Sequence, residues 1–236
     1  MYRVLVPVDR NANRARHQAQ YVARLPDADS AVAATVLYVA PPDTFTAVDE
    51  VSFSEVAAAV AAADDLEAAG VEVDRRVDDG GVSSAIVQAI DDLDADEVVM
   101  GGRKRSGVTK VLLGSIVQDV MLATDRPVTI TGERVSLGEG TRRVLVPVDR
   151  NETRARRQAQ YVTNLPGAPA SVEATVFYVF PHQDYAGAPP HEFAEVDAAS
   201  DDETIMATNT SSLRVGDIAE ATDQPEYVCG MHFFNP

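Results

Sequence analysis

Apolar positions over residues 1 to 131 alternate between short continuous runs and helical spacing. Short apolar runs bounded by Pro, Gly or Asp predict buried strands, and apolar residues recurring every three or four positions predict amphipathic helices. The predicted strands are 3–8, 32–39, 71–77, 97–101 and 127–131. The predicted helices are 13–25, 54–69, 83–93 and 111–124. This alternation predicts an α/β fold with a doubly wound, parallel, five-stranded sheet.

The pattern then starts again at a constant offset of 140 residues. Of the 37 positions from 3 to 39, 26 are identical at that offset, which indicates an internal duplication. Identity fades near residue 200, so the chain is expected to hold a complete unit over 1–131 and a partial second unit over 143–199. Residues 132–142, rich in Gly and charge, form the expected linker. Residues 201–236 do not continue the repeat.

Charge and composition narrow the classes of function. The 236 residues include 20 Lys+Arg against 37 Asp+Glu, a formal net charge of -17, and this charge disfavours binding to nucleic acid or to an anionic membrane. The acidic, lysine-poor composition is typical of a halophilic protein, although an ordinary acidic protein is the alternative. A single cysteine, Cys229, excludes an internal disulfide. With no signal-peptide pattern at the start and no long apolar run, we expect a cytoplasmic protein.

The loop after the predicted strand 97–101 carries a possible anion site. Ligands of doubly wound sheets bind beyond the carboxyl ends of the strands, and glycines, a helix N-terminus and cations there favour an anion. The loop contains Gly101, Gly114 and Ser115, and its four cations are Arg103, Lys104, Arg105 and Lys110. The alternative is that these cations pair with acidic groups of the protein's own surface.

A second candidate residue, Asp9, ends the first predicted strand at the same edge of the sheet. Its carboxylate is suited to accept hydrogen bonds from a ribose, or else to form the turn that begins the next helix. The repeat copies it as Asp149. His17, His182 and His191 are isolated and are expected on the surface. No nucleophile and base stand together, so we expect no catalysis.

Four segments together resemble the universal stress protein family: Val6-Pro7-Val8-Asp9, Leu37-Tyr38-Val39, the loop from Gly101 to Ser115, and Asp125-Arg126-Pro127-Val128. The resemblance covers residues 1–131 and, partially, 143–199. It implies that ATP or a related adenine nucleotide binds with Asp9 and Val39 beside the adenine and ribose. It also implies that Gly101, Gly114 and Ser115 hold the phosphates.

Two further points come from this resemblance. Lys104 stands where ATP-binding members of the family have a glycine, and its side chain would either crowd the phosphates or supply a charge to them. The family's last strand commonly pairs two units, so Pro127–Thr131 is the expected edge of a homodimer.

The last residues resemble another family. The segments 204–213 and 230–236 are similar to 3-hydroxyacyl-CoA dehydrogenases, and His232 and Ser211 match that family's acid/base histidine and substrate-contacting serine. A strand followed by G-x-G-x-x-G does not occur, so dehydrogenase activity is not expected. Strands over 204–208 and 227–233 around a helix over 215–222 are predicted to form a βαβ piece. It either docks on the second unit or is a poorly packed remnant of a fusion.

The leading hypothesis is therefore a cytoplasmic stress-response protein that binds a nucleotide or a similar anion without catalysis. A ligand-free dimerising interaction module is the alternative, and a remnant of a 3-hydroxyacyl-CoA dehydrogenase is a third hypothesis.

Overall fold

A computed structural model describes most of the chain, which divides into two compact units. One unit holds residues 1–142 with 163–173, and the other holds 143–162 with 174–236. The described residues are 1–41, 51–104, 111–112, 114–132, 140–148, 151–178, 206–208 and 228–230.

The first unit is built on a five-stranded sheet whose strands run parallel. In spatial order its strands are β3 (Glu72–Asp79), β2 (Val32–Ala40), β1 (Tyr2–Val8), β4 (Glu97–Gly101) and β7 (Val128–Thr131). The chain builds outward from β1 to β3, then returns to the centre and continues as β4 and β7 on the other side. The fold prediction is confirmed, and the topological switch point lies between β1 and β4.

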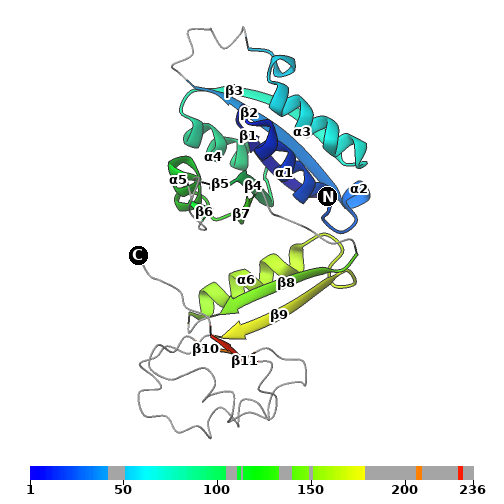
Figure 1. The fold of residues 1–236 in the computed structure, drawn as a ribbon, viewed down its shortest axis with the longest axis vertical. Coiled ribbons are helices and arrows are strands. Elements are labelled where there is room, and N and C mark those ends of the chain that lie inside the picture. Colours follow the sequence, from blue (N-terminus) through cyan, green and yellow to red (C-terminus); the bar gives the residue numbers. More distant parts are fainter. Residues whose placement is uncertain are drawn as a thin grey trace, which may run out of the picture. The chain divides into compact units, whose positions relative to one another are not determined.

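Helices cover both faces of this sheet (Figure 1). Helices α1 (Ala12–Ala23) and α3 (Ala57–Ala68) pack together on one face, and α4 (Val82–Asp92) and α5 (Ser115–Ala123) pack together on the other. The smaller elements are α2 (Ala28–Ala31), the 3-10 turn η2 (Phe53–Glu55), and the antiparallel strand pair β5 (Arg103–Lys104) and β6 (Val111–Leu112).

The core on the α4 and α5 face contains alternate residues of the strands. Leu5, Leu37 and Val98 are completely buried there, in one cluster with Ile86 and Ile90 of α4. Each fully buried side chain of this size contributes about 1.5–3 kcal/mol of transfer free energy. The sheet is thereby held rigid beneath the ends of its strands.

A glycine follows the C-terminus of helix α3. Gly70 adopts φ +84°, a left-handed conformation that favours glycine. Its N–H donates to Glu67 O at 2.9 Å, and the N–H of Val71 donates to Leu66 O at 3.1 Å, the hydrogen-bond pair of a Schellman motif.

One helix boundary was wrong. The apolar spacing predicted a helix from residue 111, but α5 begins at Ser115. Val111 and Leu112 instead pair with Lys104 and Arg103 across the loop, so a partner distant in sequence overrides the local pattern.

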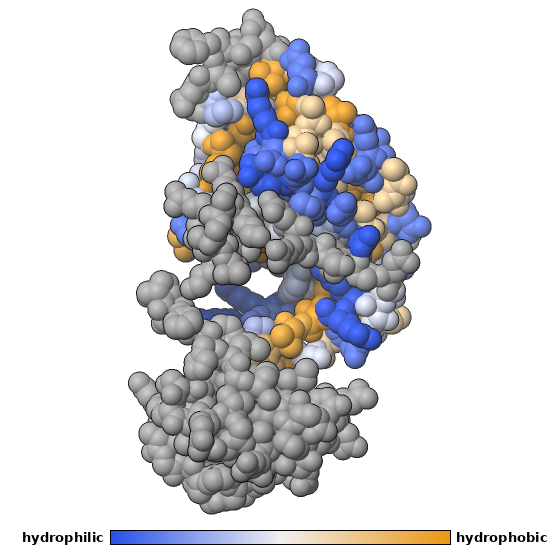
Figure 2. Space-filling model, viewed as in Figure 1, coloured by the Kyte–Doolittle hydropathy of each residue, from blue (hydrophilic) through white to orange (hydrophobic). Residues whose placement is uncertain are grey.

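The duplicated segment repeats the opening elements of the first unit. Strand β8 (Arg142–Val148), helix α6 (Glu152–Asn164) and strand β9 (Val172–Tyr178) follow one another, and β8 pairs with β9. Leu145 is 58% exposed, although its counterpart Leu5 is completely buried. Apolar surface on this segment appears as an orange patch in Figure 2. The copy therefore repeats apolar residues that lie in the core of the first unit, but the described elements of the copy do not bury them.

Two strands of the C-terminal segment are described. Strand β10 (Met206–Thr208) pairs in parallel with β11 (Val228–Gly230), within the two predicted strands. The predicted helix over 215–222 lies outside the described residues, and docking of this piece on the second unit stays a prediction. None of the described helices has the length and apolar character that a membrane span requires.

Candidate functional site

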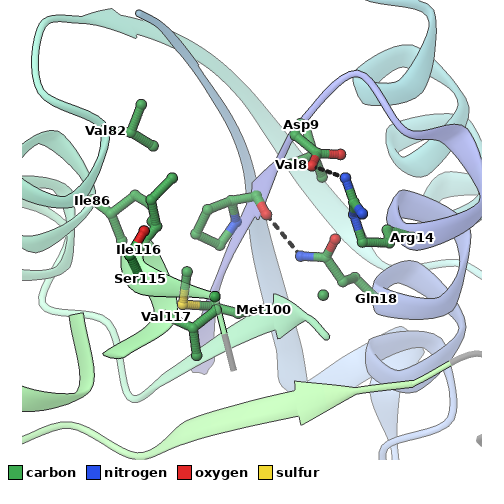
Figure 3. Close-up of a pocket in the computed structure, with 13 residues that line it drawn as sticks. Val8, Asp9, Arg14, Gln18, Val82, Ile86, Met100, Ser115, Ile116 and Val117 are labelled. Atoms are coloured by element: carbon green, nitrogen blue, oxygen red, sulfur yellow. Dashed lines mark hydrogen bonds and ion pairs between the residues drawn. The ribbon is translucent and has the colours of Figure 1, made fainter. Parts of the chain in front are cut away.

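A pocket opens at the switch point, beyond the carboxyl ends of β1 and β4 (Figure 3). Its lining atoms surround about 620 Å³ of space, part of it open to solvent. Asp9, Arg14 and Gln18 form a polar wall on the β1 and α1 side. Across from them, Val82 and Ile86 of α4 and Ile116 and Val117 of α5 form an apolar wall, with Met100 beside them. The pocket is thus suited to a ligand that has both a polar and an apolar part.

Four of the predicted site residues meet in this pocket. Asp9, Gly101, Gly114 and Ser115 all line it, although they come from the two halves of the sheet. Their meeting follows from the parallel topology, because the carboxyl ends of β1 and β4 share one edge of the sheet.

Two predicted residues stand apart from that group. Val39 is absent from the pocket lining, is 6% exposed, and belongs to the hydrophobic core with Leu37 and Ile86. Lys104 contributes its backbone to β5, where it pairs with Val111. The Lys104 side chain and residues 105–110 lie outside the described part of the structure, so their roles stay predictions.

Asp9 is held in a turn that precedes helix α1. Its Oδ1 accepts a hydrogen bond from the Asn11 backbone N–H at 2.8 Å, and Asn11 in turn is the N-cap, accepting from Arg14 N at 3.0 Å. The helix-starting turn proposed as the alternative role of Asp9 is therefore present, with Asn11 as the cap itself.

A cation that was missed from the sequence lies beside this turn. The guanidinium of Arg14 forms an ion pair and a hydrogen bond with Oδ2 of Asp9, and its side chain is only 25% exposed (Figure 3). Arg14 reaches the pocket from the first turn of α1. The pocket therefore has a cation that does not depend on the loop of 103–110.

The loop that carries Asp9 is fixed from its other side by Arg10. The Nε of Arg10 donates to the Tyr38 hydroxyl at 3.1 Å, and this hydrogen bond raises the pKa of Arg10 above its usual value. The guanidinium also lies 6.0 Å from the centroid of the Tyr38 ring. Because Tyr38 is buried in β2, the loop is tied to the sheet.

The N-termini of two helices, neither of which has a side-chain cap, lie at the same pocket. Helix α5 follows its N-cap Gly114, and α4 follows its N-cap Gly81, and neither cap has a side-chain hydrogen bond or an acidic residue in the first turn. The first residues of these helices, Val82 and Ser115, both line the pocket. Unpaired N–H groups and the positive end of the helix dipole favour an anion at this position.

Gly101 has a packing role in addition to any contact with a ligand. A Cβ atom at this position would lie 3.1 Å from Cβ and Cδ of Arg14 and 3.2 Å from Oε1 of Gln18. Helix α1 therefore approaches the end of β4 so closely that a larger residue must displace one of these side chains.

Gln18 joins the two strands that flank the pocket. Its Nε2 donates to Pro7 O at 2.7 Å (Figure 3). It also donates to Val99 O at 2.8 Å, so one amide bridges β1 and β4. This residue, too, was missed from the sequence. Its recurrence as Gln158, together with Arg14 as Arg154, was a visible signal in the repeat.

Comparisons with known proteins identify the two ends of the chain separately. The model of the 3-hydroxyacyl-CoA dehydrogenase NAD binding domain matches residues 191–236. A 3-hydroxybutyryl-CoA dehydrogenase from Clostridioides difficile is 52% identical over 44 residues, which are 19% of this chain and 16% of that protein. The chain therefore spans less than a fifth of this curated relative, and the match is confined to a fragment.

The first unit matches a different family. A universal stress protein from Archaeoglobus fulgidus is 25% identical and covers 56% of this chain and 98% of its own, with a TM-score of 0.46. Another, from Archaeoglobus fulgidus DSM 4304, is 20% identical and covers 84% of this chain and 74% of its own, with a TM-score of 0.54. A universal stress protein in complex with cAMP is 21% identical and covers 56% of this chain and 97% of its own, at a TM-score of 0.42. The universal stress protein family model matches residues 1–132, more than half of the chain, and the chain belongs to this family.

Proposed function

We propose that this chain is a non-catalytic stress-response protein of the cytoplasm that binds an adenine nucleotide, or a similar amphipathic anion, in the pocket between β1 and β4. The observation that carries the proposal is the convergence of complementary groups at the switch point. Arg14 and the N-termini of α4 and α5 favour an anion, and the wall formed by Val82, Ile86 and Ile116 suits a flat apolar group.

The polar wall is consistent with exchange of ion-pair partners on binding. In the free protein the Arg14 guanidinium neutralises Asp9. A bound phosphate would offer this guanidinium a second anionic partner, since the Arg fork matches phosphate oxygens in geometry.

The test separates ligand binding from folding by placing one charge at the start of α5. Ser115→Asp adds an acid at a helix N-terminus, which stabilises the helix by about 0.3–1 kcal/mol, but the same charge repels a bound phosphate. Ser115→Asn is the matched neutral control. Calorimetric titrations with ATP, AMP and cAMP in high salt measure affinity, and thermal unfolding measures stability.

The expected result is unchanged or increased stability of Ser115→Asp, with affinity at least about tenfold weaker than that of Ser115→Asn. Equal affinities of the two variants would show that the ligand phosphate lies elsewhere. If the wild-type protein binds none of the three nucleotides, the proposed function is wrong.

A second candidate function is supported by the edge of the sheet. Strand β7 pairs with β4 on one side and is the last strand in the described sheet. An edge strand presents unpaired backbone groups to a second chain. We therefore propose that two copies of the chain pair through β7, whether or not a ligand is bound.

A further inference from the structure

The pairing between β1 and β4, the two strands beside the pocket, stops before a proline. Strand β1 pairs with β2 without a break from Tyr2 to Val8, but its pairing with β4 is limited to Val4 with Glu97 and Leu5 with Val98. Continued in the same register, the next two backbone hydrogen bonds would run from Pro7 N to Val99 O and from Gly101 N to Pro7 O. Proline has no N–H to donate, so the first of these bonds cannot form.

Gln18 supplies the donor that Pro7 lacks. Its Nε2 carries two N–H groups: one donates to Val99 O, the carbonyl that Pro7 leaves without a strand donor, and the other donates to Pro7 O. The side chain therefore replaces the backbone hydrogen bond that Pro7 cannot make, and it joins β1 to β4 where the pocket opens.

The same two bonds fix the direction of the other end of the amide. Because both partners are carbonyl oxygens, the nitrogen must face them, and Oε1 must point away from them. Oε1 lies 3.2 Å from the position of a Cβ atom on Gly101, which lines the pocket. Gln18 is 2% exposed, and within the described part of the chain no hydrogen bond reaches Oε1.

We propose that Gln18 is a specificity-determining residue whose Oε1 accepts a hydrogen bond from a neutral donor of the ligand, either a sugar hydroxyl or an amino group of the base. This inference rests on the proposed nucleotide site. The other acceptor in the polar wall, Asp9, is already engaged by Asn11 N–H and Arg14, whereas Oε1 is both fixed and available. A ligand without the donor displaces water from Oε1 and leaves this oxygen unpaired, so the site discriminates against it.

The duplicated segment provides a matched control. Gln158 donates to Pro147 O at 2.9 Å, which repeats the bond from Gln18 to Pro7. Its Oε1 is buried without a hydrogen-bond partner, and among the described residues it has no second strand carbonyl to bridge. The contact between proline and glutamine therefore forms from one strand and one helix, with no counterpart of β4 among the described residues.

The experiment compares ligands that differ by one donor. Dissociation constants are measured by calorimetry for AMP, 2′-deoxy-AMP, 3′-deoxy-AMP and purine riboside monophosphate, which lacks the amino group. The proteins are the wild type, Gln18→Met and Gln158→Met. We expect one analogue to bind the wild type roughly 10- to 100-fold more weakly than AMP. That ratio should fall to about one in Gln18→Met and should be unchanged in Gln158→Met.

A second variant keeps the inference testable if Gln18→Met alone does not fold. In Pro7→Val/Gln18→Met, the restored N–H of residue 7 can donate to Val99 O, so the strands no longer need the amide. This double variant should fold and should bind AMP and its analogues with equal affinity.

The outcomes are distinguishable. If the wild type binds AMP and all three analogues equally, the inference is wrong while nucleotide binding stands. A selective loss that persists in the double variant also contradicts it, because the acceptor must then be another group. If the wild type binds no nucleotide, both the proposed function and this inference are wrong.

Discussion

Substituting Gly101 by alanine tests why a glycine ends strand β4. The sequence favours close approach of a phosphate to this residue, whereas the structure shows close approach of helix α1. The added Cβ would lie 3.1 Å from two carbons of Arg14 and 3.2 Å from Oε1 of Gln18, distances at which neighbours must give way. Both interpretations predict weaker ligand binding, but only packing predicts loss of stability in the free protein.

The magnitude follows from the contacts. Overpacking by one methyl group typically costs about 1–3 kcal/mol, and here Gln18 cannot move freely because its amide is bound to Pro7 and Val99. For a unit of this size, about 4 °C of melting temperature corresponds to 1 kcal/mol, so Gly101→Ala should melt roughly 4–12 °C lower. The backbone itself adds no strain, because Gly101 does not have a left-handed φ.

Thermal and urea unfolding of the ligand-free protein provide the measurement, and Gly132→Ala is the control. A Cβ on Gly132 would meet no atom within 4 Å, so this variant should unfold within about 0.5 kcal/mol of the wild type. Unchanged stability of Gly101→Ala together with lost nucleotide binding would refute the packing explanation. It would leave the phosphate as the reason for the glycine.

Three further predictions concern the fold, the edge strand and acid stability. Tyr21→Phe removes a hydroxyl that donates to the fully buried Glu97 at 2.9 Å, and should lower the free energy of unfolding by about 1–3 kcal/mol in urea titrations. The Pro127 carbonyl accepts a hydrogen bond from Val98 of β4, so the backbone N–H of the next residue, Val128, points away from β4. Val128→Pro removes this N–H and should weaken dimerisation in sedimentation experiments, whereas Val128→Ala should not. A hydrogen bond from Arg75 lowers the pKa of Glu67, so its stabilisation is present above the unfolded-state pKa and lost as pH falls through the folded-state value. Arg75→Gln should therefore reduce the loss of stability on acidification, measured by unfolding at a series of pH values.

Most of the fold could be predicted because local pattern and tertiary packing agree in the first unit. The runs over 3–8 and 32–39 are strands that bury both faces, as continuous apolar runs in parallel sheets do. The start of α5 could not be predicted, because Val111 and Leu112 extend the helical spacing of the residues that follow. Their pairing with 103–104 depends on a partner across the loop, which periodicity does not encode.

The site was predictable to the extent that it follows from topology. Asp9 and Gly101 end the two strands that flank the switch point, so their meeting was expected. Val39 was assigned by resemblance alone, and the alternation of β2 directs its side chain into the core. Gln18 was missed because its position on the buried face of α1 resembles any core position. Its role is apparent only when Pro7 is known to interrupt the pairing of β1 with β4.

The duplication shows how the two halves of this site depend on each other. Arg154 and Gln158 repeat the polar wall in sequence, and the bond from Gln158 to Pro147 shows that this half forms from one strand and one helix. The other half consists of the end of β4 and the N-terminus of α5. The described residues of the second copy include only β8, α6 and β9, which correspond to β1, α1 and β2. Because the pocket forms only where the strand order reverses, a polar wall without a counterpart of β4 lacks its opposite side. The absence of a counterpart of β4 among the described residues also explains why Gln158 has no second strand carbonyl to bridge, and it predicts one nucleotide per chain despite two copies of the motif.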